Sequence, residues 1–197
     1  MPEPPDVGFI DHWILENPWP GALALFVVAI VIGWTALVQG RLKRLPAALA
    51  LTAASTAMVV AGLLIDTSGE RSEAVTRQFV EAVVGRDSNA AIALLAGDAT
   101  FAFDSPRNPG HDMTYIKQQL RRVLEQFTIS GNTITRLDGY AVSSTQGEAH
   151  LACITDAGYG PTLSKWVVQV RPNARGEWEI TRLTCVEVNN RPASGYR

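Results

Sequence analysis

Two long stretches near the start of the chain, residues 20–40 and 45–65, contain no Asp, Glu, Lys or Arg. At about 1.5 Å of rise per residue, a helix over either stretch is roughly 30 Å long, the thickness of the hydrocarbon core of a bilayer. The first stretch is dense in Leu, Val, Ile and Phe, whereas the second is richer in Ala, Thr and Ser and would also suit a buried helix of a soluble protein. Because one run closely follows the other, the sequence predicts a transmembrane helical hairpin.

The charges that flank the two runs predict their orientation. Arg41, Lys43 and Arg44 crowd the connection at residues 41–44, whereas residues 1–19 contain acidic side chains but no Lys or Arg. Lys and Arg beside membrane helices are retained in the cytoplasm, so we expect a cytoplasmic loop and two extracytoplasmic termini. A cleavable signal peptide is the alternative for the first run, but such a peptide begins with a basic region and has a shorter apolar core. The Ala-rich composition, with Arg in excess over Lys, indicates the plasma membrane of a bacterium.

The remainder of the chain has the length and the charge balance of one extracytoplasmic domain. Residues 66–71 are polar and predict a short linker, which is followed by a domain over residues 72–188 and a tail over residues 189–197. The net charge of the whole chain is −2, with 18% charged residues. This balance gives no electrostatic reason to expect a nucleic-acid partner.

Hydrophobic periodicity predicts helices first and strands last in this domain. Apolar residues recur at helical spacing over residues 75–84 and from Met113 to Phe127, and Asp87 begins a shorter helix between them. A short apolar run predicts a first strand, and four longer runs with short turns predict an antiparallel meander: residues 100–103, then 133–142, 148–156, 162–171 and 177–188. This order is typical of an α+β fold in which helices cover one face of a curved sheet.

Two segments carry a resemblance to a known family. The segment VTRQFVEAVVGRDSNAAIALLAGDATFAF resembles the opening of nuclear transport factor two-like domains, also called SnoaL-like or cystatin-like, and GEWEITRLTCVEV is similar to their closing strand. The resemblance covers about Ser72 to Val188. It implies a cone made of a bent sheet and three helices, whose open end often becomes a ligand pocket. Members include isomerases, dehydratases, polyketide cyclases and epoxide hydrolases, as well as inert binding domains, and such domains often form homodimers.

An acid–base enzyme of this kind needs an ionisable side chain inside an apolar pocket, because desolvation moves its pKa toward the working pH. The pocket candidates are Asp104 after the first strand, Tyr140 on a strand that Gly139 can bend, and His150 on the next strand. His111 and Asp138 are further polar residues of the same region. None of them belongs to a compact catalytic motif, and a structural role is the favoured interpretation of His150, since the alternation around it does not decide which face it takes.

Metal, cofactor and nucleophile chemistry have little support in the sequence. His12, His111 and His150 are scattered, and no zinc spacing, phosphate-binding loop or nucleophile elbow is present, so we expect no metal and no cofactor. Cys153 and Cys185 would lie on strands separated by another strand, roughly 9 to 10 Å apart, whereas a disulfide needs less than about 7 Å. The sequence therefore predicts two buried free thiols rather than a disulfide.

Two functions remain open at this stage. The first is a membrane-anchored, non-catalytic periplasmic or extracellular module that binds a small apolar ligand or a protein of the cell envelope. The second is a SnoaL-like isomerase, cyclase or dehydratase that uses one of the polar candidates as a general base in the cone. The bilayer is a partner under either hypothesis, and self-association is compatible with both.

Overall fold

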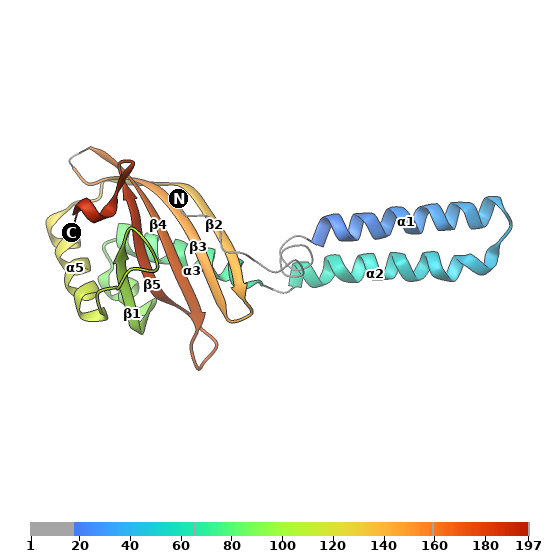
Figure 1. Ribbon diagram of the computed structural model, residues 1–197, viewed down its shortest axis with the longest axis horizontal. Helices are drawn as coiled ribbons and strands as arrows, with labels where there is room; N and C mark the ends of the chain where they lie inside the picture. Colours follow the sequence, from blue (N-terminus) through green and yellow to red (C-terminus); the bar gives the residue numbers. More distant parts are fainter. Residues whose placement is uncertain (1–17, 65, 159, 197) are drawn as a thin grey trace. The chain divides into compact units, whose positions relative to one another are not determined.

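The computed structural model describes residues 18–64, 66–158 and 160–196. The chain divides into two compact units, a helical unit that ends at Thr67 and a domain that begins at Ser68 (Figure 1).

The helical unit is an antiparallel pair. Helix α1 (Pro18–Val38) is followed by a single 3-10 turn (Leu42–Arg44) and by helix α2 (Leu45–Leu64). Small residues seven positions apart form the contact face of α1, namely Ala22, Ala29 and Ala36, and they are all buried. The hydroxyl of Ser55 on α2 donates a hydrogen bond of 2.8 Å to the carbonyl oxygen of Ala22, which locks the two helices together.

Large apolar side chains of this unit point outward, away from the partner helix. The exposed ones on α1 include Leu23, Phe26, Ile30 and Trp34, and Leu49 on α2 is exposed as well. Small residues inside and large apolar residues outside reverse the pattern of a water-soluble helical pair. Among the described residues, one helix, Trp19–Val38, is long and apolar enough to cross a membrane, although a signal sequence can have the same length and composition.

The described residues of the domain form three α-helices, six strands and a final 3-10 helix. Helix α3 (Ser68–Val84) carries the predicted apolar stripe, and α4 (Ser88–Ala93) begins at Asp87, whose carboxylate accepts hydrogen bonds from the backbone N–H groups of Asn89 and Ala90. Asp112 caps the third helix in the same way through the N–H of Tyr115. The remaining elements are β1 (Leu95–Phe103), α5 (Met113–Gln126), β2 (Gly131–Ser143), β3 (Gln146–Asp156), β4 (Pro161–Pro172), β5 (Trp178–Val188) and β6 (Arg191–Pro192).

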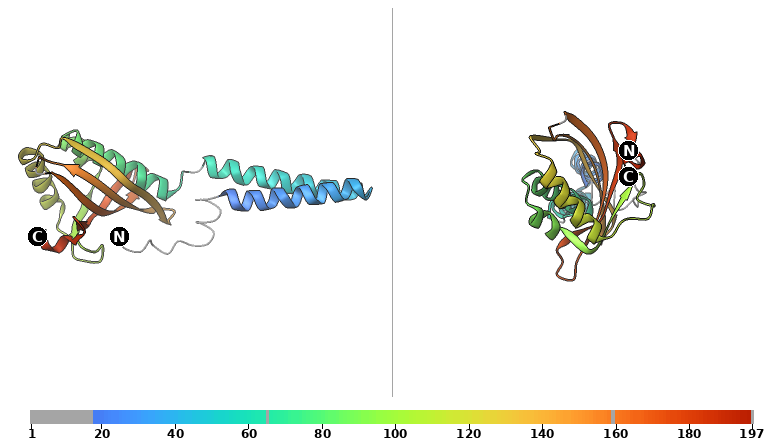
Figure 2. Two further views of the ribbon diagram at one scale, coloured as in Figure 1. Left: turned by 90° about the horizontal axis from the view of Figure 1, so that it is seen from above. Right: turned by 90° about the vertical axis from the view of Figure 1, so that its left-hand side faces the viewer.

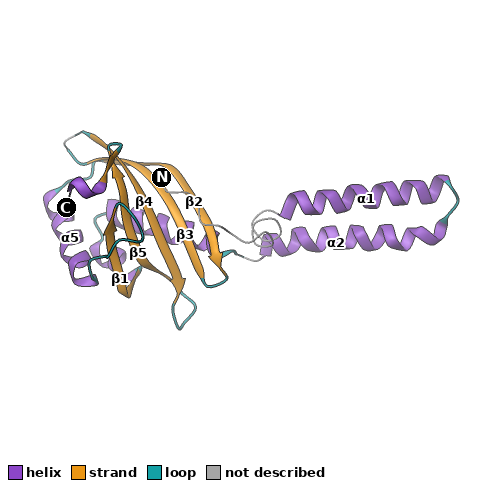
Figure 3. Ribbon diagram, viewed as in Figure 1, coloured by secondary structure: helices purple, strands orange, loops and turns teal. Residues whose placement is uncertain are grey.

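The sheet is mixed, so the predicted antiparallel sheet is wrong for its first strand. The strand order is β1-β5-β4-β3-β2, with β6 paired to β5, and β1 runs parallel to β5 (Figure 3). The predicted meander from β2 to β5 is antiparallel throughout. The difference arises because β1 reaches the meander through helix α5 rather than through a tight turn, and a strand that is connected through a helix can pair in either direction.

Helices α3 and α5 cover one face of this curved sheet (Figure 2). Two glycines allow the start of α3 to approach the edge of the sheet. A Cβ atom on Gly139 would lie 2.1 Å from the carbonyl oxygen of Gly69, and one on Gly147 would lie 2.2 Å from that of Ser68. The buried core between helices and sheet includes Val75, Ala149, Val168, Ile180 and Leu183.

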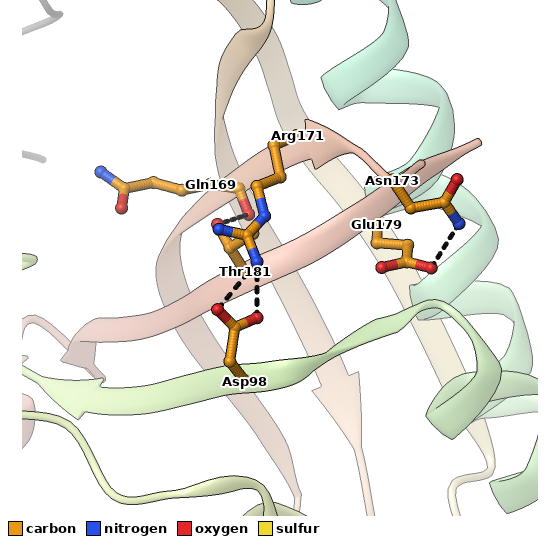
Figure 4. Close-up of polar contacts among 6 residues, drawn as sticks. All are labelled: Asp98, Gln169, Arg171, Asn173, Glu179 and Thr181. Carbon is orange, nitrogen blue, oxygen red and sulfur yellow. Dashed lines mark hydrogen bonds and ion pairs between the residues drawn. The ribbon is translucent and has the colours of Figure 1, made fainter. Parts of the chain in front are cut away.

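Polar contacts tie β1 to strand β4 across the intervening β5 (Figure 4). One guanidinium nitrogen of Arg171 donates to both carboxylate oxygens of Asp98, at 2.7 and 2.8 Å. The hydrogen bond and charge of Arg171 lower the pKa of Asp98. Both side chains are exposed, so the pair adds little to stability.

Both ends of the domain differ from the predicted boundaries. Helix α3 begins at Ser68, so most of the predicted linker over residues 66–71 is helical and the domain starts before residue 72. The predicted tail over residues 189–197 turns at Asn189 and Asn190, both with positive φ, forms strand β6 and ends in a 3-10 helix (Ala193–Tyr196). The local composition of the tail does not predict this structure, because the docking of the tail depends on side chains in other parts of the domain.

Candidate functional site

A cavity of about 430 Å³ lies between helices α3 and α5 and the face of the sheet that they cover. Its size is at the lower end of the range of about 300–1,000 Å³ that is typical of small-molecule sites. The first half of α3 packs on the sheet through buried residues such as Ser72 and Val75, whereas its second half, from Phe79 to Val84, lines the cavity. The predicted apolar stripe of this helix therefore serves both the core and the site.

The walls of the cavity are mostly apolar. Helix α5 contributes Ile116, Leu120 and Val123, the predicted stripe of that helix, and aromatic rings come from strands β1 and β4 as Phe101, Phe103 and Trp166. Among the described residues that line the cavity there is no Asp, Glu, Lys, Arg or His. The titratable side chains of the lining are Tyr115 and Cys153. Such a lining favours uncharged, apolar molecules.

Polar side chains gather on the cavity wall where β2, β3 and β4 lie side by side; we call this the polar end. Thr155 donates a hydrogen bond of 2.8 Å from its hydroxyl to the Asn132 side-chain oxygen. The indole N–H of Trp166 donates to the Ser164 hydroxyl at 2.8 Å, and that hydroxyl lies 3.3 Å from the Cys153 sulfur. The polar end is thus internally connected and contains no formal charge.

Thr76 lies on the opposite part of the wall, toward the core. Its neighbour one helical turn earlier, Ser72, approaches Gly147 at the start of β3, whereas the polar end lies near the end of that strand. Thr76 is fully buried, and its hydroxyl has no hydrogen-bond partner among the residues that the structure describes. An unpaired hydroxyl in an apolar environment is costly, and Thr76 is the one buried unpaired group of this kind in the described cavity lining.

The structure does not place Asp104 in the cavity. Asp104 follows β1 with a positive φ of 65°, and its carboxylate accepts a hydrogen bond of 2.6 Å from the backbone N–H of Ser194. Its own N–H donates to the carbonyl oxygen of Cys185. The residue therefore anchors the C-terminal segment to the sheet.

Tyr140 and His150 lie on the other face of the sheet. Leu151 and Cys153 of β3 line the cavity. Because successive side chains of a strand point to opposite faces, His150 points to the face away from the cavity. His150 is 1% exposed, its Nε2 lies 2.9 Å from a carboxylate oxygen of Glu148, and its ring packs against Tyr140 with centroids 5.0 Å apart. The sequence candidates Asp104, Tyr140 and His150 are therefore not brought together in a pocket.

Glu148 is the ionisable partner that the sequence analysis did not single out. Burial raises the pKa of its carboxyl, but the hydrogen bonds from His150 and from the Gln169 amide more than offset this effect, so the pKa lies below its ordinary value of 4.5. The carboxylate is therefore ionised and satisfied at neutral pH. This network orders the outer face of the sheet rather than the cavity.

The other polar candidates have structural roles. His111 pairs through its backbone with Phe101 and stacks its exposed ring on Tyr115, with centroids 4.1 Å apart. Asp138 forms a hydrogen-bonded ion pair with Arg136 on the same strand. No group of three metal-ligating side chains occurs among residues that the structure describes.

Both cysteines are free and buried. Cys153 lines the cavity, whereas Cys185 lies on β5, with strand β4 between the two. Burial, together with the nearby charge of Asp104, raises the pKa of the Cys185 thiol to about 12. This thiol is protonated at neutral pH and is not a nucleophile.

The polar residues that do line the cavity were not among the candidates predicted from the sequence. Thr76 interrupts the apolar stripe of α3, and Thr155 continues the alternation of Leu151 and Cys153 on β3. Either pattern could have identified a polar group on a buried face. Asn132 carries no such signal, because its position depends on the register between β2 and β3.

No protein-family model and no curated protein matches the chain, but solved structures do. An uncharacterized protein with a cystatin-like fold from Caulobacter vibrioides has a TM-score of 0.52 at 10% identity, covering 65% of this chain and 94% of that one. A candidate ketosteroid isomerase from Shewanella frigidimarina has a TM-score of 0.50 at 12% identity, with coverages of 61% and 95%. A nuclear transport factor two-like protein of unknown function from Pseudomonas putida has a TM-score of 0.48 at 17% identity, with coverages of 56% and 80%.

Identities this low carry a fold and not a function. The similarity agrees with the helices-first order, the curved mixed sheet and the cavity beneath α3 and α5. The domain that begins at Ser68 therefore has the cystatin-like, nuclear transport factor two-like α+β fold that its sequence resembles.

Proposed function

We propose that this protein is a membrane-anchored module that binds a small, mostly apolar molecule in the cavity between α3, α5 and the sheet, and that it does so without acid–base catalysis. The observation that carries this proposal is the composition of the cavity wall. It is large enough for a small molecule, it is lined by aliphatic and aromatic side chains, and its described lining contains no carboxylate, imidazole, ammonium or guanidinium group.

Catalysis by general acid or base requires a proton-transferring group within hydrogen-bond reach of the bound molecule. Asp104 is engaged with the C-terminal segment, and Tyr140 and His150 lie on the other face of the sheet. The proposal therefore gives none of them a catalytic role. An isomerase, cyclase or dehydratase of this fold would need a different group.

The anchor in this proposal is a hairpin of two membrane spans, α1 and α2. Two features support this hairpin. Small residues lie between the helices and large apolar residues point outward. The Ser55 hydroxyl donates its hydrogen bond to the Ala22 carbonyl oxygen of the other helix, so it does not need water as a partner. The basic residues 41–44 would then lie in the cytoplasm, and the domain outside.

Cysteine labelling tests this topology, because the native thiols are buried. In intact cells, an impermeant maleimide is expected to label an Arg175→Cys variant, whose site is an exposed turn of the domain. A Lys43→Cys variant, in the basic loop, is expected to label only after the cells are permeabilised. Labelling of Lys43→Cys in intact cells would contradict the orientation.

Native mass spectrometry of the purified full chain tests the binding function. A retained small-molecule mass is expected for the natural sequence and to be lost in Val80→Trp, which fills the cavity from α3. Gln78→Trp, on the exposed side of the same helix, is the matched control and is expected to keep the added mass. Equal retention in both variants would place the molecule elsewhere.

A further inference from the structure

The amide of Asn132 presents unused hydrogen-bond donors at the polar end of the cavity. Its side-chain oxygen already accepts the hydrogen bond from Thr155 at 2.8 Å. Its Nδ2 donates to no group in the described part of the chain, although Asn132 lines the cavity and is half-buried. An amide nitrogen carries two hydrogens, so this nitrogen is able to donate to a molecule in the cavity.

The Ser164 hydroxyl is a second donor that a bound molecule could use. Its oxygen accepts the hydrogen of the Trp166 indole at 2.8 Å, and it lies 3.3 Å from the Cys153 sulfur, a contact in which either group can donate. A thiol is both a weak donor and a weak acceptor. The polar end therefore has donors whose present partners are weak or missing in the described part of the chain.

The described lining of the cavity has no charged side chain that would pair with a formal charge on a bound molecule. The described lining has no basic side chain for an anion and no acidic side chain for a cation. Transfer of an unpaired ion from water into such a site is strongly unfavourable, whereas a single carbonyl or hydroxyl oxygen costs little once it accepts a hydrogen bond.

We propose that the occupant of the cavity is an uncharged molecule of mainly hydrocarbon character that carries a carbonyl, ether or hydroxyl oxygen, and that this oxygen accepts a hydrogen bond from Asn132 Nδ2. The apolar body lies between α3 and α5 against Phe101, Leu120 and Val123. This inference rests on the proposed binding function and specifies the chemistry of its ligand.

Four bicyclic probes of similar size separate the possible chemistries: tetralin has no polar group, α-tetralone has a neutral carbonyl, α-aminotetralin is a cation and α-naphthoate is an anion. Their binding is measured by equilibrium dialysis against the full chain in lipid nanodiscs, with empty nanodiscs as the reference. We expect α-tetralone to bind about 3- to 10-fold more tightly than tetralin, the effect of one neutral hydrogen bond, and both ions to bind more weakly than tetralin.

The Asn132→Asp variant tests the assigned donor with little change in shape, because its carboxylate can still accept the hydrogen bond from Thr155. We expect this variant to lose the preference for α-tetralone over tetralin and to gain affinity for α-aminotetralin relative to tetralin. Asn89→Asp adds the same charge at an exposed position of α4, outside the described cavity lining, and is expected to change none of these affinities.

The outcomes distinguish this inference from the function on which it rests. If tetralin and α-tetralone bind equally, and Asn132→Asp changes neither, the assigned donor is wrong while the cavity remains a binding site. Tighter binding of α-naphthoate or α-aminotetralin to the natural chain would overturn the uncharged ligand. Failure of all four probes to bind would overturn the proposed function itself.

Discussion

The unpaired hydroxyl of Thr76 leads to an unusual expectation, namely that its removal stabilises the ligand-free protein. Thr76 is fully buried in helix α3 and its oxygen has no partner, so the folded state leaves a polar group without the hydrogen bonds that water supplies to the unfolded chain. Valine has nearly the same shape and replaces the hydroxyl by a methyl group. Most substitutions of fully buried residues destabilise a protein, which makes the expected sign informative.

The magnitude follows from the cost of the orphaned group. A buried hydroxyl without a partner costs about 1–3 kcal/mol in mutational data. Thr and Val have similar helix propensities, so the backbone term nearly cancels. We therefore expect Thr76→Val to raise the free energy of unfolding by about 1–2 kcal/mol. Thr76→Ser keeps the hydroxyl and loses a methyl group, so we expect it to lower the free energy of unfolding.

Urea unfolding of the full chain in nanodiscs, followed by circular dichroism, measures this difference as a shift of the midpoint at constant slope. Thr184→Val provides a second case, because Thr184 is also fully buried with an unpaired hydroxyl but lies outside the cavity lining. A lower stability of Thr76→Val would show instead that the Thr76 hydroxyl is satisfied in the folded protein.

Three further predictions concern other parts of the domain. Gly139→Ala should lower the free energy of unfolding by about 3 kcal/mol or more, because the new Cβ would lie 2.1 Å from a backbone oxygen of α3. Gly131→Ala on the same strand is the control: its Cβ meets no atom within 4 Å, so urea unfolding should show a change of less than about 0.5 kcal/mol. Because the pKa of Glu148 is lowered in the folded protein, its carboxylate stabilises the fold above the ordinary pKa of 4.5, and this contribution is lost as the pH falls through the folded-state pKa. Glu148→Gln should therefore be less stable than the natural chain at pH 7 and should lose less stability on acidification. An unchanged dependence of stability on pH would contradict the network of Glu148 with His150 and Gln169. Tyr140→Phe should leave tetralin binding in dialysis unchanged, since the ring lies on the other face of the sheet, and a large loss would return Tyr140 to the site.

Much of the fold could be predicted from local patterns. The stripes of α3 and α5, the Asp87 cap and the four meander strands all follow from spacings within single elements. The parallel pairing of β1 with β5 could not, because the two strands are separated by most of the domain and no local signal specifies their partner. The docking of the C-terminal segment on Asp104 is another contact between distant residues.

The candidate site was less accessible to sequence reasoning. A search for ionisable residues led to Asp104, Tyr140 and His150, whereas the cavity is defined by their absence and by neutral groups such as Thr76 and Asn132. The face taken by His150 could not be decided, because residues on both sides of β3 are apolar and both faces are buried. Burial on two faces removes the alternation from which an orientation could be inferred.

Stabilisation by a bound probe is a direct test of a binding site in the cavity, because a molecule that binds only the folded state raises its stability by mass action. The measurement is the urea midpoint of the full chain in nanodiscs, with and without tetralin, for the natural sequence, Val80→Trp and Gln78→Trp. We expect tetralin to raise the midpoint of the natural chain and of Gln78→Trp, and the filled cavity of Val80→Trp to abolish the effect. An equal shift in all three proteins, or no shift in any, would contradict a binding site between α3, α5 and the sheet.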